Sequence, residues 1–278
     1  MNDRSKEDST LRDGRASPAR VPVQPISKWC GLIGFSRHRL GIGPVQVARR
    51  IVRRSRRATG VAIDKWFDRL HKVDTCGFIP AKSLPVDSPR VKFSHEYTPT
   101  PQTSFRRMLR QVPVNFADYT FVDYGSGKGR TLLIAAEHPF KRITGIEYSH
   151  VLVAIAEENV QKFKGKRFLC QNIESIEMDA AEYMPPDDPC LFFLFSPFNG
   201  EVLSGVIDRI RQSYRERPRP MALLYCEEKG SLPIPYSEFD KIESMQRIRT
   251  KSLPFDFGAP RQLEFTVYVN REARGDQK

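Results

Sequence analysis

The sequence predicts an α/β domain with a mostly parallel sheet and helices on both faces, preceded by a basic helical and extended N-terminal region. After Asn115, short apolar runs alternate with helical patterns, which is typical of βαβ units. A turn rich in glycine joins the first apolar run to the first helical pattern of this region. In parallel sheets such turns lie at the carboxyl ends of the strands, where ligands bind.

The charge of the chain is concentrated in its first part. Residues 1–60 hold 14 of the 45 Lys and Arg residues and 4 of the 33 acids, so this segment carries +10 of the net charge of +12. We therefore expect a basic, partly disordered arm over residues 1–58, able to make weak contacts with polyanions. A helical and Pro-rich wrapping segment follows over residues 59–115, and the α/β domain covers residues 116–272.

Composition narrows the class of protein. No stretch approaches the roughly 20 apolar residues of a membrane span, and no signal peptide opens the chain, so we expect a soluble cytoplasmic protein. The five cysteines are widely spread and form no CxxC pair, so neither a disulfide framework nor a metal site is predicted.

Local patterns place the elements along the chain. The segment Val45–His71 is typical of one or two amphipathic basic helices broken near Gly60, and Met1–Ser27 is expected to be disordered. Further helices are predicted at Gln102–Gln111, Lys128–Glu137, Ser149–Phe163 and Glu201–Tyr214. Strands are predicted at Thr120–Tyr124, Arg142–Glu147, Ile173–Met178, Cys190–Phe195, Met221–Cys226 and Leu263–Val269.

The glycine loop after the first strand gives the strongest functional indication. A phosphate-binding Walker A loop would need a glycine at Val122 and Ser or Thr at Gly129, and a dinucleotide fingerprint would need a glycine at Arg130. The spacing that remains is DxGxGxG, which resembles motif I of class I methyltransferases that use S-adenosylmethionine (SAM). Glycines allow this cofactor to approach the backbone closely. The loop residues expected at the cofactor are Asp123, Gly125, Ser126, Gly127 and Gly129.

The next two strands add further cofactor candidates. Glu147 ends the second strand 20 residues beyond Gly127, where a ribose-binding carboxylate is expected, and Tyr148 beside it could pack against adenine. For the adenine end, the candidates are Asp179 with Ala180, directly after the third strand, and the alternative Asn172, whose distance from Glu147 is the more usual one. We prefer Asp179.

With these residues in view, the chain resembles a group of bacterial class I methyltransferase-domain proteins. The resemblance runs from Val73-Asp-Thr-Cys-Gly77 through Tyr97-Thr-Pro99, the glycine loop and Asp179-Ala180 to Pro197-Phe198. It implies a Rossmann-like methyltransferase fold with a mostly parallel seven-stranded sheet, and SAM as cofactor. The family commonly has Asn where this chain has Ser196, a departure in the motif that lines the methyl-transfer channel.

The residues that would bind the methyl acceptor are predicted from the turn after the fourth strand and from the segment that precedes the α/β domain. Methyl transfer is an in-line displacement, so alignment can supply much of the catalysis and a base is needed only for a protonated nucleophile. We expect Ser196, Phe198 and Tyr97 to line the acceptor channel, and we interpret His150 as a helix-start residue. The acceptor could be a protein side chain or a small molecule. A Rossmann-like module without activity, whose arm binds nucleic acid or an anionic membrane surface, is the alternative function; a redox or nucleotide enzyme is disfavoured by Arg130.

Overall fold

The structure is a computed structural model that describes residues 44–80, 83–84, 92–93, 95–163, 168–230, 235–253 and 262–275. The predicted disorder of Met1–Ser27 lies outside these residues. Among the helices that are described, none is both long enough and apolar enough to cross a membrane.

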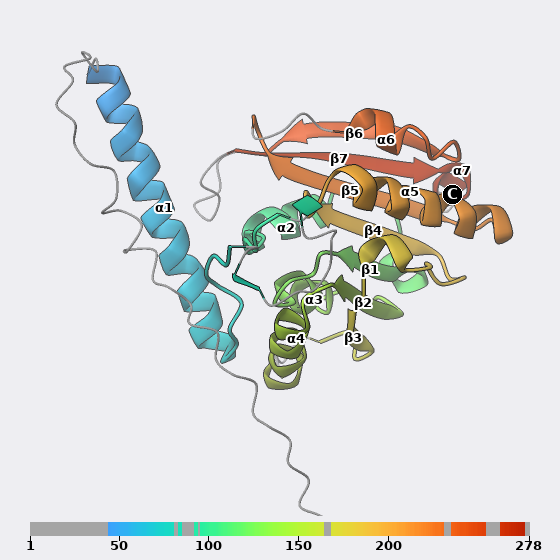
Figure 1. The fold of residues 1–278 in the computed structure, drawn as a ribbon, viewed down its shortest axis with the longest axis horizontal. Helices are drawn as coiled ribbons and strands as arrows, with labels where there is room; N and C mark the ends of the chain where they lie inside the picture. The colour runs from blue at the N-terminus through green and yellow to red at the C-terminus, as the bar shows by residue number, and fades with distance from the viewer. Residues whose placement is uncertain are drawn as a thin grey trace, which may run out of the picture.

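A seven-stranded sheet with the order β3-β2-β1-β4-β5-β7-β6 forms the centre of the molecule (Figure 1). Strands β1 to β5 pair in parallel, whereas β7 runs antiparallel between β5 and β6. The predicted Rossmann-like, mostly parallel seven-stranded sheet is thereby confirmed. The strands are β1 (Thr120–Tyr124), β2 (Arg142–Glu147), β3 (Ile173–Glu177), β4 (Cys190–Phe195), β5 (Met221–Glu228), β6 (Met245–Ser252) and β7 (Leu263–Asn270).

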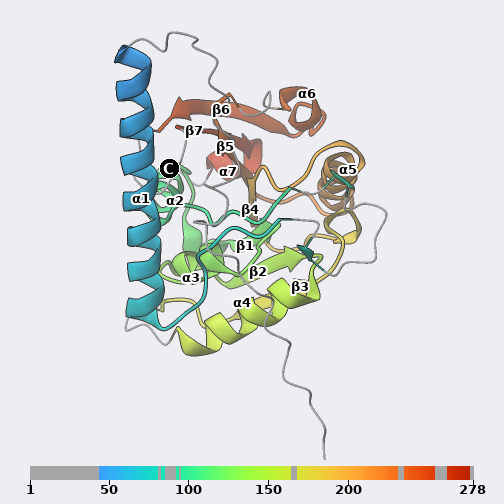
Figure 2. The same ribbon diagram turned by 60° about the vertical axis from the view of Figure 1, so that its left-hand side comes forward.

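Helices cover both faces of this sheet, because alternate side chains of its strands point to opposite sides (Figure 2). In β1, Phe121 packs into one apolar core, and Val122 and Tyr124 pack into the other. The first core receives α2 (Gln102–Leu109), α3 (Arg130–Ala135), the end of α4 (His150–Lys162) and α7 (Arg271–Gly275). The second receives α5 (Gly200–Glu216) and α6 (Tyr236–Phe239).

Strand β6 is absent from the sequence prediction. Its residues are largely polar and exposed, since β6 is the edge strand beside β7 and only Met245 is buried. An edge strand has little apolar alternation, and charged side chains there protect the edge from pairing with other chains. The six strands that the sequence did predict, β1 to β5 and β7, occur within two residues of their expected bounds.

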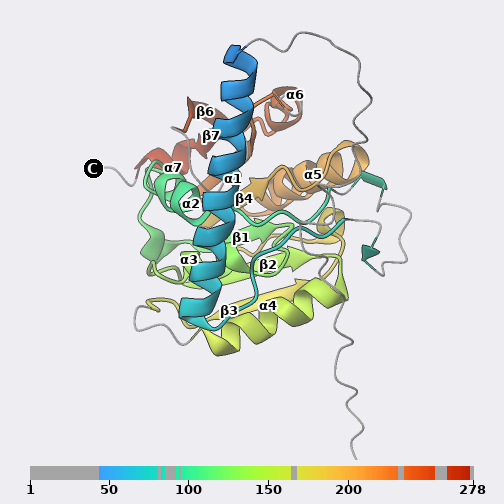
Figure 3. The same cartoon turned by 90° about the vertical axis from the view of Figure 1, so that its left-hand side faces the viewer.

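The N-terminal helix α1 (Pro44–His71) is continuous, so the predicted break near Gly60 is wrong (Figure 3). One internal glycine weakens a helix by only about 1 kcal/mol, which is too little to interrupt 28 residues. The helix also runs across residue 58, where the basic arm was expected to end. Its last turns pack on the body through Phe67, which stacks on Phe163 at 6.0 Å between ring centroids.

The chain between α1 and α2 crosses the carboxyl ends of the strands. Ile79 and Tyr97 form an antiparallel bridge. The amide of His95 donates to Pro197 O at 2.9 Å, and the amide of Asn199 donates to Phe93 O at 3.1 Å. This wrapping segment therefore lies directly against the loop that follows β4.

Candidate cofactor and acceptor site

A cavity of about 800 Å³ opens at the carboxyl ends of β1, β2 and β4. Its walls come from the glycine loop, the ends of β2 and β3, the turn after β4 and the wrapping segment. Ten of the residues predicted at the site line this one cavity: Tyr97, Asp123, Gly125, Ser126, Glu147, Tyr148, Asp179, Ala180, Ser196 and Phe198.

The two other glycines predicted at the site, Gly127 and Gly129, have conformations and neighbours that fix the shape of the loop. Gly127 has φ of +54°, and a Cβ atom there would lie 2.3 Å from the ring of Tyr97. Gly129 has φ of +78°, and a Cβ atom would meet the Cβ of Ala156 on α4 at 3.0 Å. Both positions therefore exclude a side chain, through backbone conformation and through close packing.

Glu147 joins the end of β2 to the glycine loop. Its Oε2 accepts a hydrogen bond from the amide of Gly127 at 2.9 Å, and its Oε1 accepts one from the amide of Ser149 at 3.1 Å. Each carboxylate oxygen can accept a second bond, which leaves capacity toward the cavity. Burial raises the pKa of Glu147 to about 7, although the backbone hydrogen bonds oppose this shift.

Asp123, at the end of β1, is a second buried carboxylate in the same cavity. It accepts a hydrogen bond from the hydroxyl of Thr131 in α3. Burial raises the pKa of Asp123 to about 7, and the nearby charge of Glu147 adds to the shift. In the part of the chain that the structure describes, no Lys or Arg forms an ion pair with either carboxylate.

Lys128 is one of the two cations of the loop, and it does not line the cavity. Its buried ammonium binds Asp74 Oδ1 at 2.8 Å and Cys76 O at 3.1 Å. Asn159 of α4 holds the same region, because its amide donates to the carbonyls of Asp74 and Lys128. The Lys128 ammonium is therefore occupied by oxygen atoms of the protein. This fits a loop whose sequence lacks the phosphate-binding Walker A spacing.

Arg130, at the start of α3, fastens α1 to the loop. Its guanidinium donates to Asp64 Oδ1 at 2.6 Å and to Thr75 Oγ1 at 2.8 Å, and it lies 3.8 Å from Asp68. The hydroxyl of Thr75 in turn donates to Asp68 at 2.6 Å. These partners lie 55 to 66 residues from Arg130 in the sequence, so no local pattern could have indicated them.

The two candidates for the adenine end occupy different places. Asp179 lines the cavity, and its Oδ1 accepts a hydrogen bond from the amide of Ala181 at 2.9 Å. Asn172 is exposed and does not contribute to the cavity wall. The geometry therefore favours Asp179.

The turn after β4 forms the opposite wall. Ser196 has φ of +39°, an uncommon conformation for a residue with a side chain. Phe198, two residues further on, is buried, and Tyr97 lies against the glycine loop with its hydroxyl donating to Thr75 O at 2.6 Å. The ring of Tyr97, rather than its hydroxyl, is therefore the part available to the cavity.

His95 is a site residue that sequence reasoning missed. Its Nδ1 lies 2.6 Å from Ser196 O, and since a carbonyl only accepts, Nδ1 carries the proton. In the neutral ring Nε2 is then an acceptor, and Asn199 Nδ2 donates to it at 3.4 Å. His95 and Ser196 line both the main cavity and an adjoining cavity of about 370 Å³. Only its position two residues before Tyr97 could have drawn attention to it.

One family model matches the part of the chain that forms much of this site. Residues 115–185 match a family model described as a methyltransferase domain. This segment contains the glycine loop, Glu147 and Asp179. No curated protein is detectably similar to the chain.

Several solved structures are similar to the chain at low identity. The YcgJ protein of Bacillus subtilis is 12% identical, with 61% of this chain and 99% of that chain covered and a TM-score of 0.47. Magnesium protoporphyrin IX methyltransferase of Synechocystis, solved with bound SAM, is 14% identical, with 60% and 76% covered and a TM-score of 0.39. TrmN of Thermus thermophilus is 16% identical, with 62% and 49% covered and a TM-score of 0.43.

Proposed function

The chain contains a methyltransferase domain of the class I, Rossmann-like type, and from this premise we propose that it transfers a methyl group from SAM to a small molecule or a protein side chain. The observation that carries the proposal is the pair of buried carboxylates, Asp123 and Glu147, which line one cavity and form no ion pair with a Lys or Arg among the described residues. A cavity of about 800 Å³ is within the usual range for a cofactor site.

The chemistry of the cavity fits this cofactor. SAM carries an ammonium group, a ribose with two hydroxyls and an adenine ring, and supplies an electrophilic methyl group on a sulfonium when bound. Asp123 and Glu147 offer acceptors for the cation and the hydroxyls, and the buried hydroxyl of Ser126 forms no hydrogen bond with any of the residues that the structure describes. A ligand with phosphates would instead bring negative charge beside two acids, which is unfavourable.

Each wall then has a distinct role in binding. Asp123 pairs with the ammonium, Glu147 accepts bonds from the ribose hydroxyls, and Asp179 with Ala180 holds the adenine end beside Tyr148. Gly125, Gly127 and Gly129 keep these three positions of the loop free of side chains. Burial strengthens these polar contacts because water does not compete with them.

The turn after β4 supports binding and activation of the acceptor. Ser196, Phe198 and Tyr97 face the cavity, and His95 joins it to the smaller one. Nε2 of His95 can take the proton of an acceptor that arrives as an alcohol, thiol or ammonium. The hydrogen bond from Nδ1 to Ser196 O keeps this tautomer and the ring orientation.

Calorimetric titration of the purified protein tests the cofactor assignment. SAM or its demethylated product should bind, and Glu147→Ala should weaken binding by about 1.5 to 3 kcal/mol because a buried acceptor is lost. Gly127→Val should abolish binding, because a side chain there meets the Tyr97 ring. Glu158→Ala, which removes an exposed glutamate of α4, is the matched control and should leave affinity unchanged. Circular dichroism should show that each variant is folded. Binding of NAD or ATP, with no affinity for SAM, would overturn the proposal.

A further inference from the structure

Helix α1 exposes large apolar side chains along a single face. Val52, Trp66 and Leu70 are 46%, 62% and 56% exposed. At 100° per residue, the three positions lie within about 40° of one another around the helix axis. The residues of α1 that pack on the body, Asp64 and Phe67, lie on a different face. The exposed face is therefore separate from the contact that holds α1 in place.

The polar residues within this face have their hydroxyls turned back onto the helix. Ser55 donates to Val52 O and Thr59 donates to Ser55 O, both at 3.0 Å. Both hydroxyls are thus occupied by the backbone, and the half-buried Ile63 adds another apolar group to the same arc. From Val52 to Leu70 the face is about 27 Å long.

The same helix is strongly basic. Its sequence contains eight Lys and Arg residues, six of them between Arg49 and Arg57, and two acids, Asp64 and Asp68. Both acids are buried and face Arg130 of α3, at 2.6 Å and 3.8 Å. The negative charge of α1 is therefore directed into the protein, and it does not offset the basic residues toward an external partner.

We propose that this face of α1 docks the protein onto an anionic lipid surface. A partner must offer apolar contact to Val52, Trp66 and Leu70 and negative charge to the arginine-rich half of the helix, and the interface of an anionic bilayer offers both. A nucleic acid would meet the charge but would leave Leu70 and Val52 without an apolar environment. A second copy of the chain would meet the apolar face but would bring two basic helices together.

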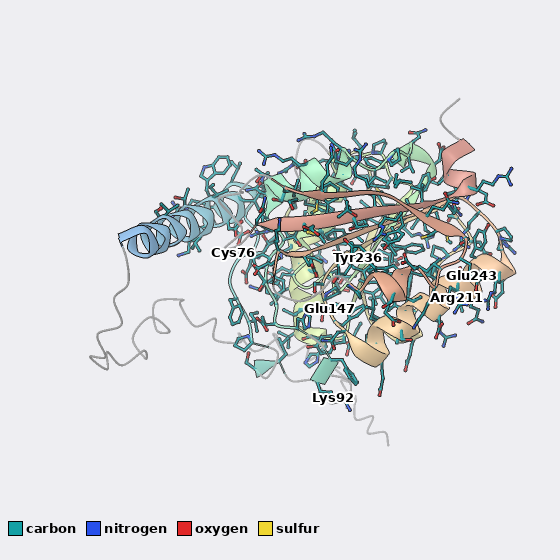
Figure 4. The ribbon with its side chains drawn as sticks, turned by 90° about the horizontal axis from the view of Figure 1, so that it is seen from above. Cys76, Lys92, Glu147, Arg211, Tyr236 and Glu243 are labelled. Atoms are coloured by element: carbon teal, nitrogen blue, oxygen red, sulfur yellow. The ribbon has the colours of Figure 1, made fainter. Side chains whose placement is uncertain are left out.

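The position of the helix allows such contact. The N-terminal half of α1 projects beyond the sheet, as the views in Figures 1 and 4 both show. Figure 4 also places Cys76 where the N-terminal region meets the body, and Glu147 within the body. The glycine loop is fastened to α1 through Arg130, so a docked helix would hold the catalytic cavity at a fixed place relative to the lipid.

Tryptophan fluorescence gives a direct test with the full-length chain. The protein has two tryptophans, so Trp29→Phe leaves Trp66 as the single reporter. Vesicles of phosphatidylserine and phosphatidylcholine should shift the Trp66 emission to shorter wavelength, and vesicles of phosphatidylcholine alone should not. Leu70→Asp in the same background should weaken vesicle binding by about tenfold or more, because an apolar anchor is replaced by a charge that the lipid repels.

Leu169→Asp is the matched control, since Leu169 is a leucine of similar exposure, 64%, in the loop before β3. It should leave vesicle binding unchanged, and circular dichroism should show both variants folded. Three results would each overturn the proposal: no emission shift with anionic vesicles, equal effects of Leu70→Asp and Leu169→Asp, or binding to single-stranded RNA without binding to vesicles. Vesicle binding requires no cofactor, so the outcome is independent of the SAM titration.

Discussion

The glycine loop and the chain that packs over it are fixed in different ways. The loop, residues 123–130, takes its shape from its own glycines, three of which have positive φ beside atoms that exclude a side chain. The segment from Asp64 to Thr100 has little regular structure after α1 among its described residues, and side chains of the loop, Lys128 and Arg130, hold its acids. The first region is a local property of the sequence, and the second depends on contacts across more than 50 residues.

This difference bears on where the functional unit begins. The wrapping segment supplies His95 and Tyr97 to the cavity and supplies the acids that pair with the loop cations. We therefore propose that residues 59–115 are part of the catalytic unit and that the arm before them is separable from it. The predictions below test this division, from the largest expected effect to the smallest.

Breaking the link between the two regions should have the largest effect. Arg130→Met leaves Asp64 and Asp68 buried without their cation, which should lower the free energy of unfolding by about 3 to 5 kcal/mol. Arg217→Met removes an ion pair whose partners are both more than 60% exposed and should change it by less than about 1 kcal/mol. Urea denaturation of the two variants measures both values, and equal losses would show that Arg130 does not fasten the segment.

The raised pKa of Glu147, which ends β2 and accepts a hydrogen bond from the amide of Gly127 in the loop, predicts a pH dependence of stability. Burial raises this pKa from 4.5 to about 7, so the folded protein holds a proton that the unfolded chain has already released between these pH values. The free energy of unfolding should therefore fall as the pH rises through this window, by on the order of 3 kcal/mol.

The variant Glu147→Gln is neutral at every pH and should lack this part of the decrease. Burial still raises the pKa of Asp123 in the variant, and only the smaller contribution from the charge of Glu147 is lost, so most of the difference between the two proteins reports on Glu147. Thermal or urea unfolding without cofactor at pH 5 and pH 7.5 supplies the comparison. Parallel pH profiles would mean that Glu147 is already ionised in the folded protein.

The acceptor wall should respond in rate rather than in cofactor affinity. Ser196→Ala and His95→Gln should slow methyl transfer to an acceptor, by up to about 10²–10⁴-fold where His95 removes the proton. Their affinity for SAM should stay within about tenfold, or 1.4 kcal/mol, because neither residue is assigned to the cofactor. Mass spectrometry of the methylated product and calorimetry provide the two readouts. A large loss of SAM affinity in either variant would move that residue into the cofactor site.

Removal of the arm should have the smallest effect on the body. A chain that lacks residues 1–58 keeps Asp64, Phe67 and Asp68 and should retain its unfolding free energy and SAM affinity within about 0.5 kcal/mol. It should lose adhesion to polyanions, since most of the excess charge lies in this arm. Differential scanning calorimetry and heparin chromatography measure the two effects. A truncated chain that cannot fold would show that the first half of α1 is needed by the body.

The sequence alone determined six of the seven strands, the glycine loop and the sheet edge at which the candidate site lies, because each depends on short-range patterns. Apolar runs specify buried strands, alternate glycines specify a tight turn, and the spacing from Gly127 to Glu147 brings two strand ends together, where the two residues form a hydrogen bond of 2.9 Å. The parallel pairing of the strands then places the carboxyl ends of β1, β2 and β4 at one edge of the sheet.

Only the tertiary structure decided what closes that edge. His95 acquires its tautomer from the carbonyl of Ser196, which is 101 residues away, and Arg130 finds Asp64 across 66 residues. The continuity of α1 through Gly60 and the polar edge strand β6 are further outcomes that local preference did not indicate. Such features depend on packing and on the pairing of buried charges, whose free energies exceed the small intrinsic preferences of single residues.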